Sequence, residues 1–304
     1  MFHLNESPRG RSLIVGLFAL FFMASQPQAK AQDTSPGIDF FSGINLNLSD
    51  MNFMHQYDVL IQLTPGFKWN MGHHWQLTGQ AIVPIVNTYG NDFNFVQIGA
   101  FNVSKEFNIS KLYIKTTIGV FSMYRYGADL KFFLPLSERL AFEAQTGYVG
   151  IVVIKPELWI SRPDSFVWTI GGDIYLPRWN TQFRGIIGRF LYQDFGCEAE
   201  VMRHFNHTTA SLYGRWSGEY GLDAGFRFVI ALPPYHRKHR AVNFRPISNY
   251  RMSYSAMYNL YSNRMYNTDP EQNERDGWFS RDLLHWGSHA MEPDFIITNK
   301  SDQQ

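Results

Sequence analysis

The stretch from Thr208 to Pro234 reads TTASLYGRWSGEYGLDAGFRFVIALPP, and its alternation in polarity decides the fold. Before the turn at 218–221, one set of alternate residues is mainly apolar (Thr208, Ala210, Leu212, Gly214, Trp216) and the other is polar (Thr209, Ser211, Tyr213, Arg215, Ser217). After the turn, Leu222, Ala224, Phe226, Phe228, Ile230 and Leu232 alternate with Asp223, Gly225, Arg227, Val229 and Ala231. A period of two residues predicts strands, each with one apolar and one polar face.

The same alternation of apolar and polar residues repeats along most of the chain. About twelve segments of roughly ten to fourteen residues alternate in polarity, and turn-forming residues separate them. They lie near 37–48, 56–69, 73–86, 94–106, 110–122, 126–135, 139–150, 165–176, 181–192, 194–204, 207–217 and 222–234. Within the segment 181–192, the run QFRGIIGRFLY is ambiguous and its faces stay unassigned.

Two architectures fit alternating strands. A soluble β-sandwich buries the apolar face, whereas a membrane barrel turns that face to lipid and the polar face inward. Strands of about ten residues exceed the five or six usual in soluble sheets and match the length that crosses a membrane at a tilt. We therefore predict an all-β fold, a transmembrane antiparallel up-and-down β-barrel of about twelve strands. An even number of strands returns the chain to its starting side.

The first 31 residues have the features of a secretory signal peptide. Arg9 and Arg11 precede the apolar run LIVGLFALFFMA, and the small-residue site Ala29-Lys30-Ala31 follows it. The run is too short for a membrane-spanning helix, which needs roughly 20 residues. We expect residues 1–31 to be removed and the mature chain to reach the outer membrane of a Gram-negative bacterium.

The alternation of apolar and polar residues ends after Pro234. The run 235–268 is basic, whereas 269–304 is mainly acidic. We expect a barrel over 32–234 and a periplasmic C-terminal tail over 235–304. The basic run would bind anionic lipid headgroups or polysaccharide, or else pair with the acidic half beside it.

Composition excludes several classes of protein. The formal net charge is +1, which argues against nucleic acid as a partner. Cys197 is the single cysteine, so an intramolecular disulfide framework is excluded.

Several runs resemble one known family of barrels. They are MYRYGADLKFFLPLSERLAFEAQTGYVG (123–150), LPRWNTQFRGIIGRFLYQDFGCEAEVMRHFN (176–206), AGFRFVIALPP (224–234) and WQLTGQAIVPIVN (75–87). Together they resemble the YjbH-type exopolysaccharide-biosynthesis outer-membrane β-barrels, of which this chain would be a short, single-barrel version. The resemblance implies a protein that assists secretion or assembly of exopolysaccharide or a capsule-like surface polymer. Expected partners are outer-membrane lipid, polysaccharide and periplasmic export proteins. The family supplies no catalytic residues to carry over.

Alternation directs a set of charged side chains toward the barrel interior. They are Lys111, Lys115, Asp129, Lys131, Glu143, Glu198, Glu200, Arg215, Asp223 and Arg227. These charges would line a conduit for a hydrated polymer, or pair with one another in a filled lumen. A barrel of about twelve strands lies between the filled small barrels and the open large ones. We favour a mostly filled lumen with acids and bases matched across strands, since unpaired buried charge is costly.

Two other functions stay open: a pore for small solutes or oligosaccharides, and an outer-membrane enzyme that modifies lipid. An enzyme would need a Ser/His pair near a strand end, for which the candidates are His204, His207, Ser211, His73 and His74. No nucleophile elbow is present, and we expect no catalytic, cofactor-binding or metal-binding residues. His236 and His239 have a suitable spacing for a metal ion, but the neighbouring cations in HRKHR oppose binding.

Substitutions at Phe228 and Arg227 test directly which face of this strand touches lipid. If the apolar face touches lipid, a charge at Phe228 costs roughly 2–4 kcal/mol near the membrane midplane. Replacing Arg227 by Gln costs less, unless it leaves an acid such as Glu200 unpaired.

Overall fold

The computed structural model describes residues 36–49, 58–90, 93–137, 139–153, 158–205, 208–231, 241–247, 249–256 and 265–269. The expected signal peptide 1–31 lies outside the described residues, as do His207, His236 and His239.

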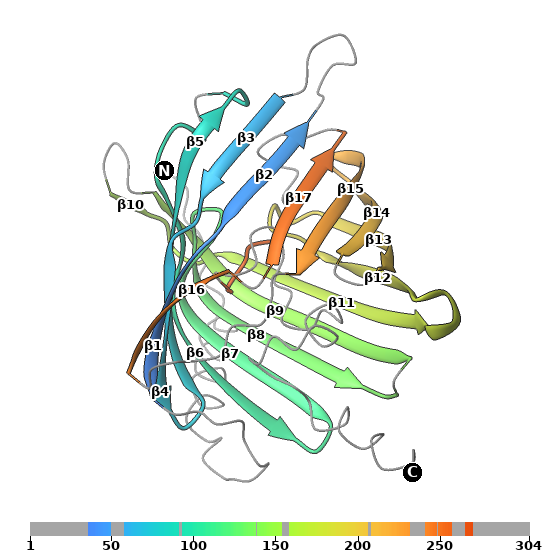
Figure 1. The fold of residues 1–304 in the computed structure, drawn as a ribbon, viewed down its shortest axis with the longest axis horizontal. Helices are drawn as coiled ribbons and strands as arrows, with labels where there is room; N and C mark the ends of the chain where they lie inside the picture. The colour runs from blue at the N-terminus through green and yellow to red at the C-terminus, as the bar shows by residue number, and fades with distance from the viewer. Residues whose placement is uncertain are drawn as a thin grey trace, which may run out of the picture. The chain divides into compact units, whose positions relative to one another are not determined.

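Strands make up 76% of the described chain (Figure 1). They are β1 (Gly37–Ser42), β2 (Ile44–Ser49), β3 (Asp58–Leu63), β4 (Gly66–Gly72), β5 (Trp75–Asn87), β6 (Gln97–Ile109), β7 (Leu112–Phe121), β8 (Arg125–Pro135), β9 (Leu140–Val153), β10 (Trp159–Ile160), β11 (Ser165–Leu176), β12 (Thr181–Arg189), β13 (Phe195–His204), β14 (Thr208–Ser217), β15 (Gly221–Ala231), β16 (Val242–Pro246) and β17 (Asn249–Ser255). A 3₁₀ turn, Pro177–Trp179, joins β11 to β12. Each of the twelve predicted segments is found as a strand or a pair of consecutive strands.

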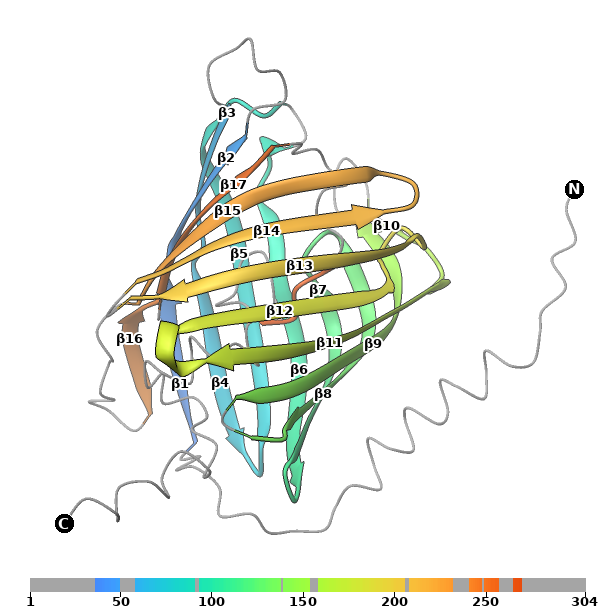
Figure 2. The same cartoon turned by 90° about the vertical axis from the view of Figure 1, so that its right-hand side faces the viewer.

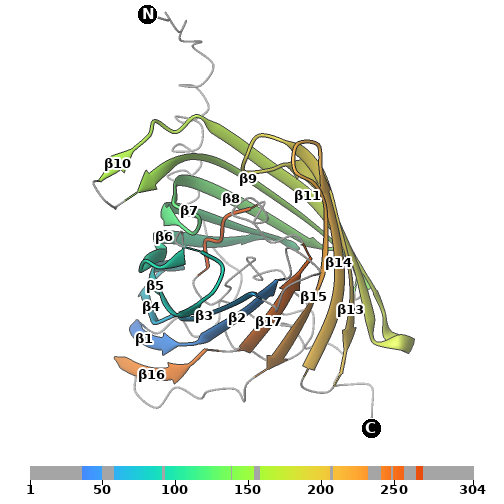
Figure 3. The same cartoon turned by 90° about the horizontal axis from the view of Figure 1, so that it is seen from above.

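The strands close into a barrel, which confirms the predicted all-β barrel fold. From β5 to β9, and on through β11 to β15, each strand pairs antiparallel with the next. The ring then continues through β17, β2 and β3 and returns to β5. This closed barrel has thirteen strands, compared with the expected twelve or so (Figure 3).

The thirteenth strand comes from the segment that we expected to be a periplasmic tail. β17 pairs antiparallel with β15 and parallel with β2, so it closes the ring. The barrel therefore extends beyond Pro234, and a wholly antiparallel arrangement is corrected to one with a parallel closing seam. An odd number of strands requires such a seam. Because Ser255 is opposite Ser49, the chain leaves the wall at the end opposite to Gly37.

Three wall strands are broken at neighbouring points. β1, β4 and β16 continue β2, β3 and β17 beyond these breaks, and β1 pairs with both β16 and β4 (Figure 2). Gly43 separates β1 from β2, and an added Cβ there would lie 2.8 Å from the Ile247 side chain. Pro65 interrupts β3 and β4, since proline has no amide hydrogen for the sheet. Glycine at the first break therefore lets Ile247 approach the wall.

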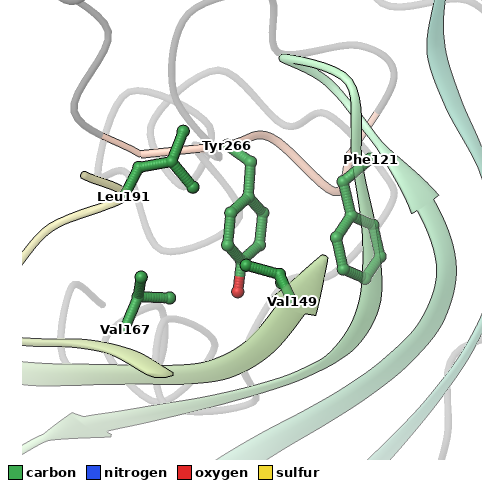
Figure 4. Packing of buried hydrophobic residues seen from close by; sticks show 5 residues of the cluster. All are labelled: Phe121, Val149, Val167, Leu191 and Tyr266. Atoms are coloured by element: carbon green, nitrogen blue, oxygen red, sulfur yellow. The ribbon is translucent and has the colours of Figure 1, made fainter. Parts of the chain in front are cut away.

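A small apolar cluster lies at the barrel end that carries the β7–β8 turn. Phe121, Val149, Val167, Leu191 and Tyr266 form it, and Figure 4 shows Tyr266 among the other four. Tyr266 belongs to residues 265–269, which we call the interior segment. Tyr266, Asn267, Thr268 and Asp269 are all buried within the barrel. Part of the expected tail therefore lies inside the lumen.

In the part of the chain that the structure describes, no helix is both long and apolar enough to cross a membrane.

Candidate functional site in the barrel lumen

The interior face of the wall is polar, as the alternation predicted. On β14, Thr209, Ser211, Tyr213, Arg215 and Ser217 are buried, whereas the alternate Leu212 and Trp216 are exposed. The same inversion holds on β15, where Asp223 and Arg227 are buried and Leu222 and Phe228 are exposed. Closure of the barrel places the buried set toward the lumen.

Nine of the ten predicted lumen charges are buried or half-buried. They are Lys115, Asp129, Lys131, Glu143, Glu198, Glu200, Arg215, Asp223 and Arg227. Lys111 is the exception, because it lies in the turn between β6 and β7 and is exposed. Its assignment to the lumen is therefore corrected: the alternation was extended past the start of the strand.

The first group of charges, which we call the arginine cluster, lies on β9 and β11–β15. It consists of Arg184, Arg215, Arg227, Glu143, Asp173, Glu198, Glu200 and Asp223. Arg215 Nε lies 3.0 Å from Asp223 Oδ2, and the Ser255 hydroxyl donates to Asp223 Oδ1 at 2.9 Å. The pair joins adjacent residues of β14 and β15, and β17 adds a neutral donor. Acids and bases are thus matched across strands.

Arg227 joins the two acids of β13. Its Nη1 lies 2.8 Å from Glu200 Oε1 and 3.6 Å from Glu198 Oε1. Its guanidinium also lies 4.0 Å from the ring centroid of Tyr213. Glu200 accepts a second bond, of 2.7 Å, from the Ser211 hydroxyl. Arg227 and Glu200 are therefore the pair that would be broken by the substitution considered above.

Arg184 is the member of the cluster that sequence reasoning missed. Its Nε donates to Glu143 Oε1 at 3.0 Å, and its Nη2 contacts both oxygens of the same carboxylate. Glu143 and Ile186 lie opposite Gly171 on either side of β11. An added Cβ on Gly171 would lie 3.1 Å from Glu143 Oε1, so the glycine leaves room for the pair to meet. On β12 the alternate residues Gln182, Arg184 and Gly188 could have indicated the interior face. The adjacent Ile186 and Ile187 place an apolar residue on each face and so obscure the alternation.

The second group, which we call the lysine cluster, lies on β4 and β6–β8. It consists of Lys68, Lys115, Lys131, Glu106 and Asp129. Lys115 Nζ lies 3.1 Å from Glu106 Oε1 on the neighbouring strand, and Lys131 Nζ lies 3.9 Å from Asp129 Oδ2. Sequence reasoning found three of these five residues and missed Lys68 and Glu106.

The interior segment binds directly to the lysine cluster. Asp269 Oδ1 lies 3.1 Å from Lys68 Nζ, and its Oδ2 lies 3.9 Å from Lys115 Nζ. Lys131 Nζ donates to the Thr268 hydroxyl at 2.7 Å. Asn102 Nδ2 donates to the Thr268 carbonyl at 2.9 Å. Every one of these contacts joins the tail to the wall, so the tail fills part of the lumen.

Tyr266 anchors the other end of the interior segment. Its hydroxyl donates to Asp129 Oδ1 at 2.6 Å, and its ring stacks on Phe121 with centroids 5.0 Å apart. Burial, with the nearby Asp129 carboxylate, raises the pKa of Tyr266 well above its usual value. The phenol therefore stays protonated and keeps donating. The backbone N–H of Asn267 completes the anchor by donating to the Ser122 hydroxyl at 2.7 Å.

Some buried polar groups have no protein partner. The hydroxyls of Ser104 and Thr117 and the side-chain amide of Asn267 are of this kind among the described residues. Such groups are ordinarily satisfied by buried water. A polar lumen with hydrated gaps fits them better than a dry core.

Among the candidates for a Ser/His pair that the structure describes, no serine bonds to a histidine. His204 Nδ1 lies 2.9 Å from the Thr209 hydroxyl and its Nε2 3.2 Å from Gln182 Oε1. Ser211 donates to Glu200, as described above. His73 and His74 occupy the exposed turn after β4. Among the described residues, no three metal-binding side chains come together.

The outer face is apolar across many strands. Ile170, Ile187, Cys197, Trp216 and Leu222 lie directly opposite one another on consecutive strands β11 to β15. All five are exposed, four of them by more than half. A monomeric soluble protein rarely exposes so continuous an apolar surface.

Comparison with known proteins gives no family. No protein-family model matches the chain, and no curated protein matches it. The site is therefore interpreted from its own geometry.

Proposed function

We propose that this protein spans the outer membrane of a Gram-negative bacterium. The observation that carries the proposal is the inverted polarity of the barrel, with paired charges inside and a continuous apolar face outside. This arrangement is stable in a lipid bilayer, where the apolar face contacts hydrocarbon, but is unfavourable in water. Closure of the ring also pairs the strand edges, which a hydrocarbon environment demands.

Within that membrane, we propose that the barrel assists secretion or assembly of a surface polysaccharide. The lumen wall carries amide and hydroxyl groups of the kind that bind sugar hydroxyls; they include Asn45, Gln62, Thr78, Gln80, Asn102, Ser104, Gln182 and Ser253. The resemblance to exopolysaccharide-biosynthesis barrels points the same way. Outer-membrane lipid, polysaccharide and periplasmic export proteins would be its partners.

A pore that is always open has less support. The interior segment bonds to β4, β6, β7 and β8 inside the barrel, so it would have to move before a polymer or oligosaccharide could pass. Single-channel recordings of the reconstituted protein separate these functions. Stable conductance in the absence of any ligand would favour the small-solute pore over assistance to a polymer.

The experiment that tests the proposal compares polymer inside and outside cells. A strain lacking the gene is complemented with the wild-type chain, or with Cys197→Ser as a control that alters only the exposed outer face. We expect the deletion to reduce surface and released polysaccharide while polymer accumulates in the periplasm, and both complementing genes to reverse this. Unchanged polymer in both compartments would refute the role in export.

A further inference from the structure

Three lysines from strands distant in the sequence meet the same two residues of the interior segment. Lys68, Lys115 and Lys131 come from β4, β7 and β8, and their side chains are at most one-tenth exposed. Lys68 and Lys115 contact the carboxylate of Asp269, while Lys131 donates to Thr268. The wall thus presents several ammonium groups to one point in the lumen.

A site of this kind selects an anion. Ammonium groups withdrawn from water need negative partners, because their desolvation is costly. Glu106 and Asp129 belong to the wall itself, whereas Asp269 reaches the lysines from a segment that is no part of the sheet. Asp269 therefore shows which chemical group the site accepts, namely a carboxylate.

The interior segment contains one buried side chain, that of Asn267, that the wall does not satisfy. Tyr266, Thr268 and Asp269 bond to the wall, and so does the Asn267 backbone. Both polar atoms of the buried Asn267 side chain, however, lack a hydrogen-bond partner. A buried polar group without a partner weakens the state that buries it. The segment can consequently be exchanged for a ligand that satisfies the same wall.

We infer that Lys68, Lys115 and Lys131 form an anion-binding site in the lumen, that Asp269 occupies it as an internal ligand, and that a carboxylate on an acidic sugar chain displaces Asp269. The inference rests on the proposed function, since it takes the ligand to be a polysaccharide. Asn102, released from the Thr268 carbonyl, then offers its amide to a sugar hydroxyl. The lumen opens only when an acidic polymer is present.

The test reports on the position of the interior segment in the full chain. Asn267→Cys, in a Cys197→Ser background, places a lone thiol at a residue that is 3% exposed. The protein is reconstituted in vesicles, and the rate of reaction with a small water-soluble maleimide is measured. Oligogalacturonate, a chain of uronic acids, is the probe, and maltohexaose is the matched neutral sugar.

We expect slow reaction without ligand, at least about tenfold acceleration by oligogalacturonate, and none by maltohexaose. Asp269→Asn should accelerate the reaction without ligand by roughly ten- to a hundredfold, the range expected from the loss of a charged hydrogen bond. Asp223→Asn is the control, being the same change in the arginine cluster, where Asp223 bonds to Arg215 and Ser255. It should leave the rate unchanged.

A second variant keeps the inference testable if Asp269→Asn does not fold. An added Cβ on Gly147 would lie 1.8 Å from the Tyr266 hydroxyl but 3.4 Å from the Ala128 carbonyl, so Gly147→Ala should displace Tyr266 and leave the strand in place. It should also accelerate the reaction. A thiol that reacts as fast as an exposed one in the unaltered segment, or a rate that oligogalacturonate does not raise, would overturn the inference.

These outcomes are separate from those of the export experiment. The reconstituted protein needs no polymer pathway, so a rate that oligogalacturonate leaves unchanged removes the anion site and leaves the role in export standing. Acceleration by oligogalacturonate together with normal export in the deletion strain would remove the role in export and keep the site.

Discussion

The substitution Arg227→Gln probes the arginine cluster at its most connected residue. Arg227 contacts Glu200 at 2.8 Å and Glu198 at 3.6 Å, and lies 4.0 Å from the Tyr213 ring centroid. Glutamine keeps a polar side chain but removes the charge. The change removes this arginine from Glu200, which keeps the Ser211 hydroxyl and has Arg184 opposite it on β12.

The magnitude follows from what remains behind. Removing one partner of a buried ion pair costs about 3–5 kcal/mol, because the other charge stays buried, and Arg184 opposite Glu200 places this case at the lower end of that range. The lost contact with Tyr213 adds about 0.5–2 kcal/mol. Replacing both partners, as in Arg227→Gln with Glu200→Gln, removes the orphaned charge. We expect the double variant to regain much of the loss, since neither charge of the pair then stays buried without the other.

The assay is reversible denaturant unfolding of the barrel in lipid vesicles, followed by tryptophan fluorescence. We expect the free energy of unfolding to fall by about 3 kcal/mol or more in Arg227→Gln and by much less in the double variant. A loss below about 1 kcal/mol in the single variant would mean that Glu200 is hydrated and the lumen open at this level. An equal loss in both variants would contradict the pairing itself.

Three further predictions concern the seam, the outer face and the interior segment. A chain ending at Pro234 lacks β16 and β17, so the strand that joins β15 to β2 is missing and the ring stays open. We therefore expect no heat-resistant barrel on electrophoresis. A folded barrel from this fragment would contradict the closure. Phe228→Lys, next to Arg227 but on the outer face, should cost roughly 2–4 kcal/mol in the same vesicles, whereas a cost within about 0.5 kcal/mol is expected if that face meets water. The raised pKa of Tyr266 favours its neutral form in the lumen, so its contribution to holding the segment is present below pH about 10 and is lost as the pH rises further. Ultraviolet titration should therefore give the same tyrosinate signal near pH 10 for Tyr266→Phe as for the wild type, and a smaller signal in the variant would show that Tyr266 ionises normally.

The strands and most of their faces could be predicted because the signal is local. A period of two residues orients each side chain by its neighbours alone, as with Leu222 and Asp223 on β15. The expectation that buried acids and bases would be matched across strands followed from that facing and from the cost of a lone buried charge, and Arg227 with Glu200 is one such pair. Lys111 was misplaced because the alternation was continued into a turn, where it no longer sets the facing.

What could not be predicted depends on contacts between distant parts of the chain. β17 carries its own alternation, Tyr250, Met252 and Tyr254 against Arg251, Ser253 and Ser255, but its basic surroundings and the break at Ile247 resembled a solvated tail. Its parallel pairing with β2 joins residues about two hundred positions apart, a match that no local pattern encodes. The interior segment has no periodicity at all. Its place is set by Lys68, Lys115 and Asp129, which only the closed barrel brings together.

The central claim is that the apolar face of this barrel lies in lipid, and the chain carries its own probe for it. Cys197, the single cysteine, is exposed between Ile187 and Trp216 on that face. A nitroxide attached to Cys197 in the reconstituted full chain can be tested for collision with oxygen, which concentrates in lipid, and with a water-soluble nickel chelate. The account predicts frequent collision with oxygen and little with the chelate. Frequent collision with the chelate would place this face in water and contradict the account.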